Sequence, residues 1–180
     1  MKISEILDVG CGQKKEGTVN IDIDRNVKPD VLCDMLFFPF RKGSFRKVIL
    51  TWVVEHTTKP DQLISGCYEV LEPSGIIDVG FPNVASFTVL LDWLRKNLTY
   101  SESLILGDPS KPYLTHKGLF TVPKVERLLL AHGFRIEKVV GHPPSVGSRL
   151  LRSIGYVLVR LFPQRAGTIT VTARKEGIKF

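Results

Sequence analysis

The chain has 180 residues, of which 43% are hydrophobic and 24% are charged. These values are ordinary for a soluble globular protein and predict one domain rather than two. No stretch reaches the roughly 18 apolar residues of a membrane span. The first strand is expected almost at the N-terminus, which leaves no room for a signal peptide, so we expect a cytoplasmic protein. The three cysteines show no CxxC spacing, so neither a disulfide framework nor a zinc site is indicated.

The formal net charge of +7 is unevenly distributed. Residues 1–110 contain 12 Lys and Arg against 15 Asp and Glu, whereas residues 111–180 contain 13 against 3. A basic half indicates an anionic partner: nucleic acid, a phosphorylated or sugar-nucleotide substrate, or an anionic membrane surface. Solubility alone is an equally good explanation.

The segment LDVGCG at 7–12, followed by NIDID at 20–24, predicts the opening of a nucleotide-binding α/β fold. Gly10 and Gly12 permit a sharp turn after the first strand and a close approach of a ligand to the backbone. A dinucleotide site would require a small residue in place of Lys15 and an acid about 20 residues further on, but Asp22 follows much sooner. The carboxylate of Asp8 disfavours a pyrophosphate and suits a ligand that carries ammonium and sulfonium charge.

Further along the chain, apolar periodicity and turn residues predict alternating strands and helices. The predicted strands are Ile3–Val9, Val19–Ile23, Val31–Cys33, Lys47–Leu50, Ile76–Phe81, Phe134–Val140 and Thr168–Ala173. The predicted helices are Asp61–Leu71, Ser86–Leu98, Val122–Ala131 and Val146–Phe162, and Thr99–Thr115 is predicted to be a loop. Residues 10–18 are too few for a full crossover helix, so the first helix should be a turn or missing.

Several of these segments together resemble the class I S-adenosylmethionine-dependent methyltransferases, in particular the branch called methyltransferase type 11. In chain order they are DVGCG (8–12), NIDID (20–24), CDMLFFPFRKGSF (33–45), VILTWVVEH (48–56), EVLEPSGIIDVGFPN (69–83), THKGLFT (115–121) and AHGF (131–134). The chain departs from the family pattern at Arg46, where relatives carry Asp, and at Ser74, where relatives carry Gly.

The resemblance implies a Rossmann-like three-layer α/β sandwich, with a mostly parallel seven-stranded sheet and an antiparallel last strand. Residues 1–180 would form a single methyltransferase domain. Within it, residues 84–120 would form the lid and loop on the acceptor side.

The resemblance also implies S-adenosylmethionine as cofactor. Asp22 would accept hydrogen bonds from both ribose hydroxyls, with Asp24 as the alternative. Asp34 would meet the adenine amino group, with Met35 and Leu36 near the ring. The full predicted cofactor set is Asp8, Gly10, Cys11, Gly12, Asp22, Ile23, Asp34, Met35, Leu36, Thr51 and Trp52. Without the resemblance, these acids would be interpreted as solvated strand ends.

Methyl transfer requires proximity, alignment and, for an oxygen nucleophile, a base, so no metal is expected. His56 and His116 are the candidate bases, because histidine accepts a proton near neutral pH. A structural role for either histidine stays open. Glu55 is expected to hydrogen-bond to the backbone rather than to take part in chemistry, and His132 and His142 are weaker candidates.

The function predicted from these residues is methyl transfer to a small-molecule or glycan-type acceptor, at oxygen. One alternative is an RNA methyltransferase, which the basic half permits, although the chain has TWVVEH where base-amine methyltransferases carry Asn/Asp-Pro-Pro-aromatic. The other alternative is a non-catalytic S-adenosylmethionine-binding accessory protein, which the shortened first helix would suit. The sequence leaves a homodimer open.

The predicted helix at 146–162 carries one continuous apolar stripe. It consists of Leu150, Leu151, Ile154, Val157, Leu158, Leu161 and Phe162, with Arg149, Arg152 and Arg160 outside it and Arg165 beyond it. The stripe either packs on the sheet and the acceptor pocket or stays partly exposed. In the second case the helix would dock on an anionic membrane or a lipid-linked glycan.

Overall fold

The computed structural model describes residues 5–94, 106–107, 114–143 and 149–176, and for 149–154 it describes the backbone alone. Its strands are β1 (Ile6–Val9), β2 (Val19–Asp22), β3 (Val31–Leu32), β4 (Phe45–Thr51), β5 (Leu71–Pro82), β6 (Phe134–His142) and β7 (Thr168–Lys175). Its helices are α1 (Pro60–Val70), α2 (Phe87–Leu94), α4 (Val122–Ala131) and α5 (Arg149–Leu161), with short 3-10 turns η1 (Arg25–Val27), η2 (Val54–His56) and η4 (Pro163–Arg165).

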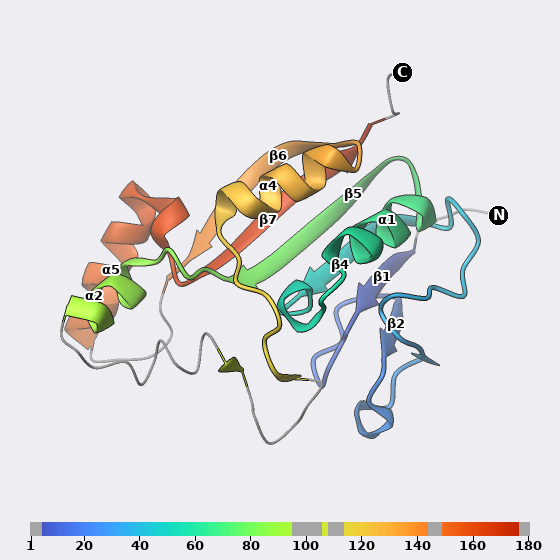
Figure 1. Cartoon of the computed structure of the whole chain (residues 1–180), viewed down its shortest axis with the longest axis horizontal. Helices are drawn as coiled ribbons and strands as arrows, with labels where there is room; N and C mark the ends of the chain where they lie inside the picture. The colour runs from blue at the N-terminus through green and yellow to red at the C-terminus, as the bar shows by residue number, and fades with distance from the viewer. Residues whose placement is uncertain (1–4, 95–105, 108–113, 144–148, 177–180) are drawn as a thin grey trace.

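The strands form one seven-stranded sheet in the order β3-β2-β1-β4-β5-β7-β6 (Figure 1). The pairs from β3 to β5 are parallel, and β7 runs antiparallel to β5 and to β6. The predicted fold class is therefore confirmed, including the antiparallel last strand.

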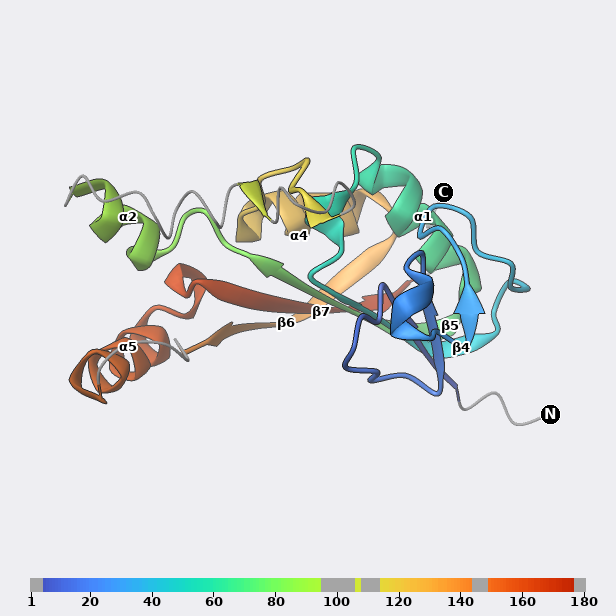
Figure 2. The ribbon, with the colours of Figure 1, turned by 90° about the horizontal axis from the view of Figure 1, so that it is seen from below.

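Helices α1 and α4 cover one face of the sheet (Figures 1 and 2). Pro60 stands at the start of α1, where its missing N–H is harmless, and the apolar residues that follow at helical spacing are buried. The core between these helices and the sheet includes Leu63, Ile64, Val125, Leu129, Leu7, Leu50, Val79 and Val171. This face accordingly holds the main hydrophobic core.

The opposite face of the central strands is polar. Thr168, Thr170, Thr172 and Arg174 alternate along β7 with the buried Ile169, Val171 and Ala173. Thr172 donates to Asp78 at 2.6 Å, and Asp78 also pairs with Lys47 at 2.6 Å. Among the described residues no helix covers the centre of this face, and α5 lies beyond its end (Figure 2). The predicted second helical layer is thus reduced, because charged and hydroxyl side chains around Asp78 interrupt the apolar surface on this face.

The predicted loss of the first helix is confirmed, since residues 10–18 pass from β1 to β2 without a helix. Thr18 instead holds the returning chain against β1, donating its backbone N–H to the Ile6 carbonyl at 2.9 Å. The next connection contains only η1. At the carboxyl ends of β1 and β2, where the cofactor is expected, the chain therefore forms short loops rather than the N-termini of α-helices.

Element bounds agree with the predictions to within a few residues, apart from β5. That strand begins at Leu71, directly after α1, and not at Ile76. Of the predicted lid and loop, residues 95–105 and 108–113 lie outside the described residues. Within the described part of the chain, no helix is both long and apolar enough to cross a membrane.

Candidate active site

The loop after β1 is fixed to the end of β2. The amides of Gly10 and Cys11 donate to the Ile21 carbonyl at 2.8 and 3.1 Å, and the amide of Gly12 donates to Asp22 Oδ2 at 2.9 Å. Gly10 and Gly12 have φ values of +65° and +52°, which favour glycine. A Cβ on Gly12 would meet nothing within 4 Å, so this part of the loop borders open space where a ligand can approach the backbone.

Asp22 lies at the end of β2 with both carboxylate oxygens turned toward loop amides. Oδ1 accepts from the amide of Asp24 at 2.8 Å, while Oδ2 holds Gly12. Asp24 instead caps η1, since its Oδ1 accepts from the amide of Asn26 at 2.9 Å. The arrangement favours Asp22 over Asp24 as the residue nearest the glycine loop.

Asp8 and Cys11 are buried under this loop. Asp8 Oδ2 accepts from the amide of Glu16 at 2.8 Å, and burial raises the pKa of Asp8. Burial, with the nearby charges of Asp22 and Asp8, raises the pKa of Cys11 to about 11, so Cys11 is a neutral thiol. Both side chains are buried beneath the surface of the loop. A direct contact of either one with the cofactor stays a prediction.

Asp34 follows β3, the neighbour of β2, and its Oδ1 accepts from the amide of Leu36 at 2.9 Å in a tight turn. Met35 and Leu36 pack against the core. Two apolar side chains near these acids are exposed to solvent, Ile23 to 54% and Phe37 to 66%. Phe37 was not among the predicted residues, although its place next to the acid and the Met-Leu pair could have indicated it.

These features suit S-adenosylmethionine. Open space at Gly12 admits the cofactor to the backbone, carboxylates at the ends of β2 and β3 offer acceptors to hydroxyl and amino groups, and Ile23 offers an apolar surface for a ring. The residues present therefore fit the cofactor that the motifs imply.

Thr51 and Trp52 end β4 on the same edge, as open α/β sheets require of ligand-binding residues. Trp52 is 43% exposed and has a φ of +59°, an uncommon conformation for an aromatic residue. Its amide donates to the Gly80 carbonyl at 2.9 Å. Strain of this kind clusters at functional sites.

His56 and His116 come together from distant parts of the chain. Their rings lie 4.9 Å apart between centroids, and His56 Nδ1 is 3.2 Å from the Thr115 carbonyl oxygen. Because that oxygen can only accept, Nδ1 carries the hydrogen and Nε2 is left as an acceptor. Burial lowers the pKa of His56, and the neighbouring charges of His116 and Lys117 lower it further, against the effect of the Thr115 carbonyl.

Glu55, beside the pair, is fully buried, and neither of its carboxylate oxygens has a hydrogen-bond partner among the described residues. The hydrogen bond predicted from this side chain to the backbone is therefore not formed with another described residue. Burial raises the pKa of Glu55 to about 8, with its own amide acting in the opposite direction. One carboxylate oxygen and one ring nitrogen from each histidine all lie within 4.8 Å of one another.

The other two described histidines lie elsewhere. His132 Nδ1 is 2.8 Å from the Leu128 carbonyl oxygen at the end of α4, and His142 Nε2 is 2.8 Å from Thr170 Oγ1 on the polar sheet face. Val53, by contrast, connects the histidine pair to the cofactor loop, because a Cβ on Gly10 would lie 2.7 Å from Val53 Cγ2. The cofactor loop and the η2 turn are thus adjacent.

Residues 7–79 match the sequence profile of the methyltransferase domain. Together with the shared fold, this match supports a class I S-adenosylmethionine-dependent methyltransferase. The search of curated protein sequences found no match.

Solved structures of methyltransferases share this fold. A SAM-dependent methyltransferase from Archaeoglobus fulgidus has a TM-score of 0.62 and 18% identity, over 94% of this chain and 85% of that one. A putative methyltransferase from Bacillus halodurans has a TM-score of 0.63 and 16% identity, over 98% and 95%. Phosphoethanolamine N-methyltransferase 2 of Haemonchus contortus, in complex with S-adenosyl-L-methionine, has a TM-score of 0.59 and 16% identity, over 98% and 50%.

Proposed function

We propose that this methyltransferase transfers a methyl group to a hydroxyl of a small-molecule or glycan-type acceptor. The supporting observation is the His56–His116 pair, which lies beside the cofactor loop through Val53 and leaves a ring nitrogen of His56 as a proton acceptor. A hydroxyl needs such a base, because it is a weak nucleophile until its proton is removed.

In this proposal the glycine loop, Asp22 and Asp34 hold the cofactor and Trp52 borders the acceptor. When bound, S-adenosylmethionine supplies the methyl carbon, which forms a bond to the acceptor oxygen while its bond to sulfur breaks and the electron pair stays on sulfur. The hydroxyl proton passes to His56 Nε2 or to His116. The Thr115 carbonyl orients the His56 ring throughout, by accepting from Nδ1.

The acceptor class can be tested with methyl-labelled S-adenosylmethionine and fractionated cell extract, treated with ribonuclease or with glycosidase. We expect label in a small-molecule or glycosidase-sensitive fraction. Label in a ribonuclease-sensitive fraction would instead support the RNA methyltransferase alternative. Cofactor binding without transfer to any fraction would support a non-catalytic accessory protein.

The roles of the histidines can be tested by His56→Ala and His116→Ala, with His142→Ala as the control on the far sheet face. Loss of a general base lowers turnover by about 100-fold or more. We expect this loss in at least one of the two variants, with unchanged affinity for S-adenosylhomocysteine, and no loss in the control. Full turnover in both variants would show that neither histidine is the base.

A further inference from the structure

Acid–base catalysis by the histidine pair leaves Glu55 unexplained. A buried carboxyl group without a hydrogen-bond partner in the described structure is costly, and native proteins rarely retain one without a reason. The Glu55 side chain also does not link the η2 turn to the segment at Lys117. Its backbone carbonyl does that, by accepting from the amides of Lys117 and Gly118 at 2.7 and 3.2 Å.

We propose that Glu55, His56 and His116 bind a divalent transition-metal ion. Their donor atoms lie within 4.8 Å of one another. A zinc ion with bonds of about 2.0–2.2 Å places its ligands roughly 3–3.5 Å apart, so small side-chain rotations would close the site. The two segments that carry the ligands are already joined by the Lys117 and Gly118 amides and by the contact of His56 with Thr115.

The donor set selects the kind of metal. Two imidazole nitrogens and one carboxylate oxygen suit zinc, iron, cobalt or nickel, whereas magnesium and calcium prefer oxygen ligands alone. A bound cation would also neutralise the buried Glu55 carboxylate. Three protein ligands leave coordination positions open to water or substrate. In the metal-bound protein the coordinated ring nitrogens no longer serve as free bases. If the proposed function holds, the metal takes over that role, because an acceptor hydroxyl in an open position loses its proton more readily. Metal binding itself does not depend on that role.

Cobalt(II) provides a direct probe, because its visible absorption changes when it enters a site with nitrogen ligands. We expect the purified protein to give this absorption, zinc to displace the cobalt, and magnesium to leave it bound. Glu55→Gln and His116→Ala should weaken cobalt binding by at least about tenfold, since removing even indirect support of a metal ligand has effects of that size. His142→Ala, which removes a histidine elsewhere, should bind like the wild type.

Glu55→Gln keeps the shape of the side chain, so the variant is expected to fold. Thermal unfolding with and without zinc measures both its stability and its response to the metal. We expect zinc to raise the Tm of the wild type and of His142→Ala but not of Glu55→Gln. Absence of cobalt binding in the wild type, or equal binding by wild type and Glu55→Gln, would overturn the site. Methyl transfer without cobalt binding would overturn the metal site and leave the proposed function standing. Cobalt binding without methyl transfer would support the metal site and contradict the proposed function.

A different surface supports a second proposal, at the end of the molecule formed by α2 and α5 (Figures 1 and 2). Phe87 of α2 and Phe162, the residue that follows α5, lie 5.9 Å apart between ring centroids. Large apolar side chains on both are between 45% and 68% exposed, namely Leu90, Leu91, Trp93, Leu94, Tyr156, Val157, Leu161 and Phe162. The interpretation that the stripe of α5 packs inward is thus wrong for Val157, Leu161 and Phe162.

We infer that this apolar end, defined by those eight residues, docks on an anionic lipid surface. Arg160 and Arg165 are exposed beside it, and the C-terminal half of the chain is strongly basic. Trp93 and Tyr156 are the residue types that prefer the boundary between lipid and water. Apolar burial and attraction to anionic lipids act together in such surfaces.

Sedimentation with vesicles tests the docking. We expect the protein to sediment with vesicles of phosphatidylglycerol and phosphatidylcholine at low salt, and less so at high salt or with phosphatidylcholine alone. Trp93→Ser, Leu161→Ser and Arg160→Glu should each reduce sedimentation. Leu130→Ser is the matched control, since Leu130 is 56% exposed on α4. Absence of sedimentation, or a solution dimer that Leu161→Ser dissociates, would overturn the proposal.

Discussion

Gly12 and Gly43 allow the cofactor loop to be tested by a matched pair of substitutions. Both glycines have left-handed backbone, with φ values of +52° and +69°, and a Cβ would clash at neither position. Gly12→Ala and Gly43→Ala should therefore destabilise the protein to a similar degree, by roughly 1–2 kcal/mol. Only Gly12→Ala should weaken binding of S-adenosylhomocysteine, because its methyl group would occupy the space beside the loop. Denaturant unfolding and calorimetry measure the two effects, and unchanged binding by Gly12→Ala would mean that the cofactor does not approach this loop.

Asp22 and Asp24 differ in which groups their carboxylates bind, although only Ile23 separates them. Asp22 receives loop amides on both oxygens, whereas Asp24 caps η1. Asp22→Asn should weaken S-adenosylhomocysteine binding by about 10- to 100-fold, since a hydrogen bond to a charged group contributes roughly 1.5–3 kcal/mol. Asp24→Asn should change the affinity little. If calorimetry gives the reverse order, Asp24 is the ribose acceptor.

Elements with strong periodicity could be predicted from the sequence, and α4 was predicted with its observed bounds of Val122 and Ala131. The start of β5 could not. Leu71 looks like the last apolar residue of the helical stripe of α1, but it pairs with Phe45 of β4. Only the neighbouring strand decides this, and sequence periodicity carries no information on that neighbour.

The same limit applies to the site. Asp22 lies near the end of one predicted strand and His56 follows another, so their common edge could be predicted from the parallel sheet. The burial of Glu55 could not be predicted, because it depends on tertiary packing. The backbone contact of Glu55 with Lys117, which is far away in sequence, is part of that packing.

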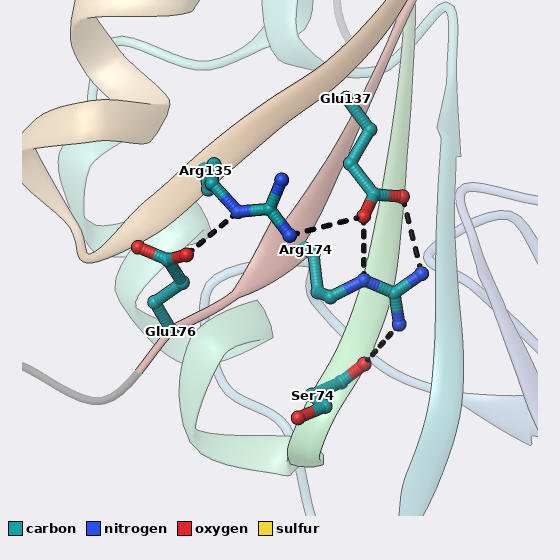
Figure 3. A network of polar contacts seen from close by, with 5 residues as sticks. All are labelled: Ser74, Arg135, Glu137, Arg174 and Glu176. Atoms are coloured by element: carbon teal, nitrogen blue, oxygen red, sulfur yellow. Dashed lines mark hydrogen bonds and ion pairs between the residues drawn. The ribbon is translucent and has the colours of Figure 1, made fainter.

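The first residues of β5 contain a strained position that offers an element-scale test. Ser74 has a φ of +63°, where the family carries glycine, and its carbonyl accepts from Arg174 Nη1 at 2.9 Å in the ion-pair network around Glu137 (Figure 3). Ser74→Gly keeps that carbonyl and removes the strain, so it should stabilise the protein by roughly 0.5–1 kcal/mol. Ser65→Gly, at an exposed position within α1, should destabilise it by a similar amount. Denaturant midpoints measure both. Destabilisation by Ser74→Gly would show that no strain is stored there.

At the scale of the whole molecule, the sheet has one apolar face and one polar face, which sets it apart from a sheet buried between two full layers of helices. The register shows this directly. Asp78 of β5 pairs with Thr172 of β7, and Val79 with Val171, so each face keeps its character between these two strands. Covering the polar face with helices would bury Asp78 and Lys47 and remove their contact with water.

Neighbouring positions of β7 test this asymmetry with a pair of nearly isosteric substitutions. Val171 is fully buried on the helix face, whereas Thr170 is half-buried on the polar face beside His142. Val171→Thr should destabilise the protein by about 1–3 kcal/mol, because it buries a hydroxyl in an apolar core. Thr170→Val exchanges the same groups in the opposite direction and should change the free energy of unfolding by less than about 1 kcal/mol, because water replaces the lost hydrogen bond. Denaturant unfolding of both variants gives the comparison. A large stabilisation by Thr170→Val would mean that the face is covered by packed apolar groups in solution, and comparable losses in both variants would mean that the two faces are equally buried.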